Sequence, residues 1–122
     1  MLFAAILAFS LQAAADQSGP TRLACEAGPI VREYGGNDWL VYGCSDERSF
    51  VVVSSSESPA NPFVFMFLFE NGSYRIRGEG NGDESATSAA FDELSQLTPD
   101  EISNIVSAVS EAPEGAAAAA QN

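Results

Sequence analysis

The sequence contains no lysine and no histidine, and it has only two cysteines and one tryptophan in 122 residues. Without histidine the chain lacks the commonest acid or base at neutral pH and the commonest metal ligand. Without lysine it cannot form a serine–lysine catalytic pair. Two cysteines are too few for a four-ligand structural zinc site of the cysteine–histidine type within one chain. These absences exclude the most familiar forms of hydrolytic and zinc chemistry.

Other catalytic patterns are also missing. The chain has no Gly-x-Ser-x-Gly motif, and no histidine that could serve as the base of a serine nucleophile. Two carboxylates can support glycoside hydrolysis, but pairs occur throughout a chain with 17 acidic residues and indicate nothing. We therefore expect a non-enzymatic protein that uses no cofactor, with a small carboxylate-dependent secreted enzyme as one alternative.

Basic residues are scarce, and their distribution is uneven. Five arginines face 17 acidic residues, giving a net charge of −12, which argues against binding to nucleic acid or to anionic membranes. Residues 16–77 hold 8 acids and 5 arginines, whereas residues 78–122 hold 9 acids and no base. The second part is expected to form an acidic surface, which is either a solvated face or a docking surface for a basic partner. Its candidate residues are Asp92, Glu93, Asp100 and Glu101.

The longest uncharged apolar stretch begins the chain. Residues 2–15 are almost wholly apolar but too short to span a membrane, and Ala13, Ala14 and Ala15 resemble a signal-peptide cleavage site. A soluble protein with an apolar first helix is the alternative, because the segment carries no basic residue. We predict a signal peptide over residues 1–15, a single domain over 16–113 and a disordered alanine-rich tail over 114–122. The mature protein would be secreted or periplasmic, with no stable membrane insertion.

The two cysteines, Cys25 and Cys44, are 19 positions apart in the predicted mature chain. An even pair in an oxidising compartment indicates one disulfide. A redox-active dithiol is the alternative, but that chemistry usually uses a closely spaced Cys-x-x-Cys pair. A structural disulfide between Cys25 and Cys44 is therefore the prediction.

The middle of the chain shows strand patterns separated by turn residues. Runs of aromatic and branched residues indicate strands, and Asn71–Gly72 is a strong hairpin signal. Gly28–Pro29 and the segment 35–38 are expected to be turns, and 78–84 is expected to be a loop. Four strands are clearly indicated, at 39–44, 49–54, 63–69 and 73–77, and two further strands, 21–25 and 30–34, are only weakly indicated.

Two helices are predicted after the strands. Residues 85–97 offer an apolar face, and Thr98, Pro99 and Glu101 form a helix start with a capping box. The second helix then continues to Pro113, which ends it. The predicted fold class is α+β: a small antiparallel β-meander of four or five strands followed by two C-terminal helices packed on the sheet. The sequence leaves open which sheet face the helices cover.

The strand 63–69 is apolar on both of its alternating faces. In one interpretation, its phenylalanines form one face of the core, while Val64, Met66 and Leu68 meet the helices or a second layer. In the other, one face stays partly open as an apolar groove for a ligand or partner protein. The candidate apolar binding face consists of Phe63, Phe65, Phe67 and Phe69.

One short segment weakly resembles a calcium loop. Glu79, Asn81 and Asp83 alternate as oxygen donors, but the glycine and the final acid that an EF-hand loop requires are missing. A flexible acidic connector is the simpler interpretation, so we predict no metal site and keep these three residues only as a weak candidate. The functional expectation is an exported acidic domain that binds an unknown protein or apolar ligand, with a structural envelope protein as a further alternative.

Overall fold

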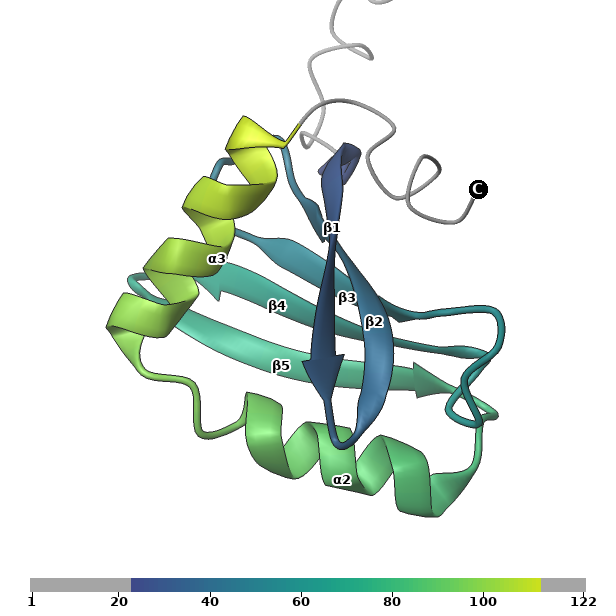
Figure 1. Ribbon diagram of the computed structural model, residues 1–122. Helices are drawn as coiled ribbons and strands as arrows, with labels where there is room; N and C mark the ends of the chain where they lie inside the picture. Colours follow the sequence, from purple (N-terminus) through teal and green to yellow (C-terminus); the bar gives the residue numbers. More distant parts are fainter. Residues whose placement is uncertain (1–22, 113–122) are drawn as a thin grey trace, which may run out of the picture.

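The computed structural model describes residues 23–112. They form a five-stranded antiparallel sheet followed by two helices (Figure 1). The strand order is β1-β2-β3-β4-β5, so every strand pairs with its neighbours in the chain. The predicted α+β meander with two C-terminal helices is therefore confirmed. The elements are β1 (Ala27–Tyr34), β2 (Asn37–Gly43), β3 (Phe50–Ser54), β4 (Phe63–Glu70), β5 (Ser73–Gly80), α2 (Glu84–Leu94) and α3 (Pro99–Glu111).

The predicted signal peptide, residues 1–15, and the predicted tail, residues 114–122, lie outside the described residues. Within residues 23–112, no helix has both the length and the apolar character needed to cross a membrane.

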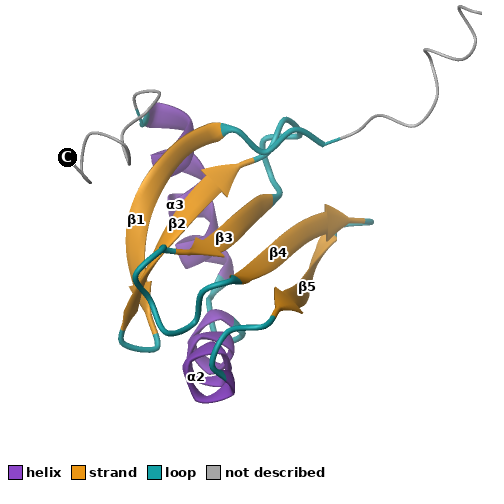
Figure 2. Ribbon diagram, turned by 90° about the vertical axis from the view of Figure 1, so that its right-hand side faces the viewer, coloured by secondary structure: helices purple, strands orange, loops and turns teal. Residues whose placement is uncertain are grey.

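The sheet is strongly curled. Figure 2 shows it arching from β1 and β2 on the left to β4 and β5 on the right, with α2 below the opening and α3 behind. The inner face of the arch carries Trp39, Val41, Phe50, Val52, Phe65 and Phe67, all of which are buried. Leu94 of α2 and Val109 of α3 join the same core. Both helices therefore cover the inner face.

The core is fixed by aromatic packing and by one buried hydrogen bond. Phe50 stacks on Phe67 with ring centroids 4.4 Å apart, and Trp39 lies 5.4 Å from Phe65. The Trp39 indole nitrogen donates to the Tyr34 carbonyl oxygen at 3.1 Å. That bond satisfies the polar atom of a side chain that is otherwise completely enclosed.

Two tight turns follow the sequence signals. Asn71 and Gly72, between β4 and β5, have φ of 53° and 85°. Gly35 and Gly36, between β1 and β2, have φ of 62° and 82°. Positive φ at both central positions matches the twist of a two-residue hairpin, and asparagine and glycine tolerate it best.

The start of the sheet differs from the prediction. We expected two short strands, 21–25 and 30–34, separated by a turn at Gly28–Pro29. The structure has one strand, β1, that passes through Gly28 and Pro29 and shifts its register against β2 between Ala27 and Ile30. The shift is a bulge, and Gly28 takes a φ of 92° there. Glycine and proline therefore mark an irregular strand rather than a turn.

The end of the sheet also differs. We expected a loop over 78–84, but β5 continues to Gly80 and the connection to α2 is only residues 81–83. The ladder with β4 persists because Phe65 pairs with Gly78 and Phe63 pairs with Gly80. Gly78 suits this position, since a Cβ atom there would lie 2.9 Å from the Phe63 ring. The first helix is also shorter than predicted, ending at Leu94 instead of Leu97.

Candidate binding surfaces

The phenylalanines of β4 belong mainly to the core. Phe65 and Phe67 are 2% and 1% exposed beneath the helices. Phe63 and Phe69, at the two ends of the strand, are partly buried. The central part of the candidate apolar face is therefore closed to a partner, because the helices dock on that side. Only its two ends reach the surface.

The opposite side of the sheet is the uncovered one. The registers of the first four strands place eight apolar side chains together on the outside of the arch. We call this surface the outer face. Seven of its members are partly exposed and Val31 is 41% exposed. The outer face consists of Val31, Leu40, Tyr42, Val51, Val53, Val64, Met66 and Leu68.

This arrangement corrects the interpretation in which Val64, Met66 and Leu68 meet the helices or a second layer. Both helices pack their buried residues into the inner core, so these three side chains face outward. Neighbouring apolar side chains that reach the surface together often mark an interaction site in a soluble protein. The outer face is therefore the strongest candidate binding surface among the described residues.

The outer face ends in charged residues along β5. On β5, Arg75 pairs with Leu68 and Arg77 pairs with Met66 across the ladder. Arg75 and Arg77 also form ion pairs with Glu70 at 3.4 Å and Glu79 at 3.6 Å. These pairs are exposed and contribute little to stability. The two ion pairs nevertheless leave the charge along β5 locally balanced, although the protein as a whole is strongly acidic.

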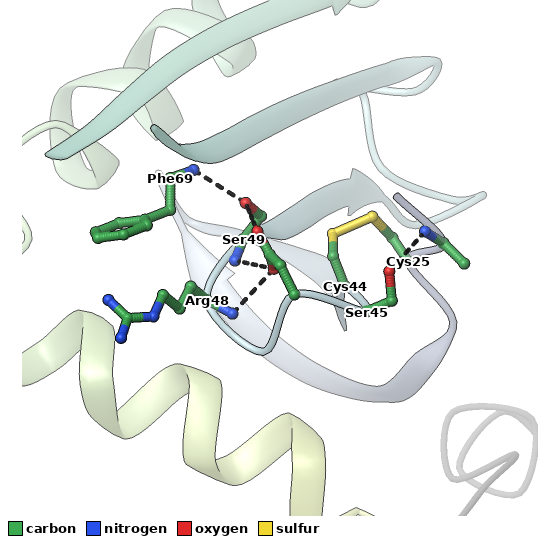
Figure 3. Close-up of a disulfide and its surroundings, with 8 residues drawn as sticks. Cys25, Cys44, Ser45, Arg48, Ser49 and Phe69 are labelled. Carbon is green, nitrogen blue, oxygen red and sulfur yellow. Dashed lines mark hydrogen bonds between the residues drawn. A yellow bond between two sulfur atoms is a disulfide. The ribbon is translucent and has the colours of Figure 1, made fainter. Parts of the chain in front are cut away.

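The disulfide is present as predicted. Cys25 and Cys44 are bonded with an S–S distance of 2.04 Å, and the bond joins the segment before β1 to the end of β2 (Figure 3). The Ser45 hydroxyl accepts a hydrogen bond from the Ala24 backbone nitrogen at 3.2 Å, which adds a second tie between the same segments. This arrangement supports the structural role of the bond.

The turn after Cys44 contains a compact polar network. The Asp46 carboxylate accepts hydrogen bonds from the Ser49 hydroxyl at 2.7 Å and from the backbone nitrogens of Arg48 and Ser49. The buried Ser49 hydroxyl in turn accepts from the Phe69 nitrogen at 2.9 Å (Figure 3). Burial alone would raise the pKa of Asp46, but these hydrogen bonds outweigh it and hold the pKa below its ordinary value.

The exposed end of the phenylalanine row forms one wall of a hollow of about 570 Å³ between the β4–β5 hairpin and α3. The Arg48 guanidinium lies 4.7 Å above the Phe69 ring. Burial raises the pKa of Tyr74, and the Asp46 carboxylate adds to the rise. The phenol therefore keeps its proton and donates to the Arg48 carbonyl oxygen at 2.7 Å. The side chain and the backbone of Arg48 therefore both contact this end of the β4–β5 hairpin.

The weak calcium candidate does not form a ligand cluster. Glu79 lies in β5 and pairs with Arg77, whereas Asp83 caps α2 by accepting from the Ser85 nitrogen. The Asn81 nitrogen donates to the Pro62 carbonyl oxygen. Within residues 23–112, no three histidine, cysteine or acidic side chains are placed to share a metal ion.

The four candidate acidic residues have different structural environments. Glu93 accepts a hydrogen bond from the Gly35 nitrogen at 2.8 Å and so ties α2 to the β1–β2 turn. Glu101 completes the predicted capping box by accepting from the Thr98 nitrogen. Asp100 is exposed in the first turn of α3, and Asp92 lines a hollow beside β5. The acidic surface is thus partly structural, with Asp92 and Asp100 still free to interact.

Sequence reasoning missed five members of the outer face: Val31, Leu40, Tyr42, Val51 and Val53. A signal was present, because β2 and β3 are apolar on both alternating faces just as β4 is. In a strand that is buried on one face alone, apolar residues alternate with polar residues. The unbroken apolar runs therefore indicated a second buried or binding face.

Comparisons with protein-family models, with curated proteins and with solved structures find no match to this chain. The function has to be argued from the surfaces themselves.

Proposed function

We propose that this protein is an exported, non-enzymatic interaction domain that binds another protein through its outer face. The observation that carries the proposal is the side-by-side placement of eight apolar side chains on a sheet face to which neither α2 nor α3 contributes a buried residue. Maintaining such a surface in water carries an aggregation risk. A surface of this kind is readily explained if a partner covers it.

The shape of the outer face favours a protein over a small ligand. Small-molecule sites are concave and bury most of the ligand. The larger hollows of the described residues lie elsewhere, between β5 and α2 and between the β4–β5 hairpin and α3. The outer face is instead the outside of an arch (Figure 2). An extended apolar surface without a hollow is best covered by the surface of another macromolecule.

Charge argues for a different protein and against a second copy. Each chain carries a net charge of −12, so two copies repel each other as they approach. A partner of neutral or basic charge would not meet this barrier. The apolar stretch over residues 2–15 and the Cys25–Cys44 disulfide both support export, because disulfides persist in oxidising compartments.

Site-specific photocrosslinking in the organism that makes the protein tests this proposal. A benzoylphenylalanine replaces Tyr42 or Val31 on the outer face, and Ser107 on the exposed side of α3 serves as the control position. We expect the same heterologous adduct from both outer-face positions and none from Ser107. An adduct of twice the protein's own mass, equal adducts at all three positions, or no adduct would each contradict the proposal.

The partner captured in this way must then lose affinity when the outer face is made polar. Val51→Thr together with Val53→Thr removes two methyl groups from the interface without changing side-chain shape greatly. At about 0.8 kcal/mol per buried carbon, the dissociation constant should rise by about tenfold. Val106→Thr on α3 is the matched control and should leave binding unchanged. Equal affinities for the double variant and the control would overturn the assignment.

A further inference from the structure

A second surface lies on the inner side of the molecule, between β5 and α2. Here a hollow of about 510 Å³ is lined by Phe63, Phe65 and Phe91. Because Phe65 is only 2% exposed, the accessible ring surface comes from Phe63 and Phe91. We call it the aromatic hollow. Phe63 and Phe65 have ring centroids 4.8 Å apart, and Phe65 and Phe91 have centroids 6.2 Å apart. Phe91 is 43% exposed, which is unusual for so large an apolar side chain in a helix that packs on a core.

Glycines let the rings beside the aromatic hollow lie close to the backbone of β5. Gly78 and Gly80 of β5 and Gly82 of the following loop all line it. A Cβ atom at Gly78 would lie 2.9 Å from the Phe63 ring and 3.1 Å from the Phe65 ring. A Cβ atom at Gly80 or Gly82 would instead meet the backbone of the segment before or at the start of β4. The glycine at position 78 therefore places no β5 side chain over the Phe63 ring, whereas the other two allow close packing of the chain.

The rim of the aromatic hollow is acidic. Glu84 and Asp92 of α2 line it, and they lie eight positions apart, so both project toward the same side of the helix. No basic residue occurs anywhere from Gly78 to the end of the sequence. The hollow therefore combines aromatic rings with carboxylates and with the most negative part of the chain.

We propose that the aromatic hollow binds an arginine or lysine side chain presented by a basic segment of a protein. A cation is attracted to the faces of aromatic rings, and flanking carboxylates add a direct electrostatic attraction. A basic segment fits better than a small free cation because the negative charge continues along α2 and α3, beyond the hollow. Further cations on the segment would gain from Asp100 and Glu111, which are both exposed.

This inference does not depend on the outer face. The two surfaces lie on opposite sides of the sheet and differ in chemistry, since one is aliphatic and the other is aromatic and acidic. Failure of the outer-face experiment would leave the aromatic hollow untouched, and the reverse also holds.

Titration of the isotope-labelled, disulfide-bonded protein with a short peptide of glycine, serine and arginine tests the inference. The same peptide with citrulline in place of arginine is the control, because citrulline is a neutral analogue of similar shape. We expect saturable shifts of the backbone amides of Gly78, Gly80 and Phe91 with the arginine peptide only. Absence of saturable shifts at these amides, or equal shifts with the citrulline peptide, would overturn the inference.

Two substitutions separate the aromatic and ionic contributions. Phe91→Leu keeps an apolar side chain but removes the ring, and should weaken binding by about two- to fivefold. Glu84→Gln should weaken it to a similar extent, whereas Glu111→Gln, a matched loss of one charge at the far end of α3, should have a smaller effect. Equal losses for the two glutamate variants would mean general charge attraction only, which contradicts a specific site.

Choline chloride supplies the last comparison. A small quaternary ammonium ion carries the same charge as an arginine side chain but has no peptide attached. We expect it to bind the aromatic hollow more weakly than the arginine peptide does. Binding of choline that equals or exceeds that of the peptide would contradict the assignment of a protein segment and would identify a small organic cation as the occupant.

Discussion

Asp46 is a carboxylate whose environment differs clearly from that of a free acid in water. It accepts three hydrogen bonds from the turn that follows Cys44, and the Ser49 hydroxyl continues the network to β4. The lowered pKa of Asp46 means that the folded state favours its ionised form. Asp46, which lies in an exposed turn, is thus connected through Ser49 to the pairing of β3 with β4.

Replacing Asp46 with asparagine should alter how stability depends on pH. Because the folded pKa of Asp46 lies below the unfolded value of about 3.9, its contribution is complete above that pH. The contribution is lost as the pH falls through the lower folded value. The difference in unfolding free energy between the wild type and Asp46→Asn should therefore be largest near neutral pH and shrink in acid. Urea unfolding followed by Trp39 fluorescence measures it, and a difference independent of pH would refute the prediction.

At the scale of elements, local signals were sufficient for the turns and the helix starts. The Asn71–Gly72 hairpin and the Thr98–Glu101 capping box depend on residues a few positions apart, so the sequence contains the whole cause. The bulged β1 and the extension of β5 depend on pairing with β2 and β4, which local propensity does not reveal.

The choice of sheet face was beyond prediction for a different reason. Strands β2, β3 and β4 are apolar on both faces, so either face could have met the helices. The outcome depends on how the helices fit the sheet. Val109 of α3 lies directly over Gly43, where β2 has no side chain. The small residue provides the space that lets α3 approach the inner face.

This fit can be tested by a double-mutant cycle. A Cβ atom at Gly43 would lie 2.6 Å from the nearest Val109 methyl carbon, so Gly43→Ala should cost about 1–3 kcal/mol. Val109→Ala should cost about 2 kcal/mol by leaving a cavity. In the double variant the smaller side chain accommodates the added methyl group, so the combined cost should be less than the sum. Strictly additive free energies of unfolding would show that the two residues are not in contact.

The disulfide acts on the pairing of β1 with β2. Cys25 and Cys44 close a loop with a sequence separation of 19, and a loop of that size contributes about 3 kcal/mol in the chain-entropy model. We expect a reductant to lower the free energy of unfolding by about this amount and therefore to lower the urea concentration at the unfolding midpoint. A variant with Cys25→Ser and Cys44→Ser should have the lower urea midpoint from the outset, and reductant should not change it. Indifference of the wild type to reductant would contradict the structural role.

For the molecule as a whole, the dominant electrostatic feature is its uncompensated negative charge. The ion pairs found within residues 23–112 involve Arg75 and Arg77, both in β5, while α2 and α3 carry no basic residue. Glu111 stands in the last turn of α3, where the helix dipole disfavours an acid. Stability should therefore be limited by repulsion along the helices.

Screening should relieve this repulsion. Raising NaCl from about 0.01 M to about 0.1 M shortens the Debye length from about 30 Å to about 10 Å, so the urea midpoint should rise. Glu111→Gln should be more stable than the wild type at low salt, and the gap should narrow as salt increases. A midpoint that falls or stays constant with salt would show that repulsion is not a limiting term.

The contact of α3 with β1 also determines when the fold can be completed. Each strand pairs with a neighbour in the chain, so the hairpins can form in sequence without closing long loops. The last element, however, packs against the first two strands. A chain that emerges amino-terminus first during synthesis or export can therefore form its sheet strand by strand. Its core remains partly exposed until residues 99–111 have also emerged. The fold is therefore completed only after α3 has emerged.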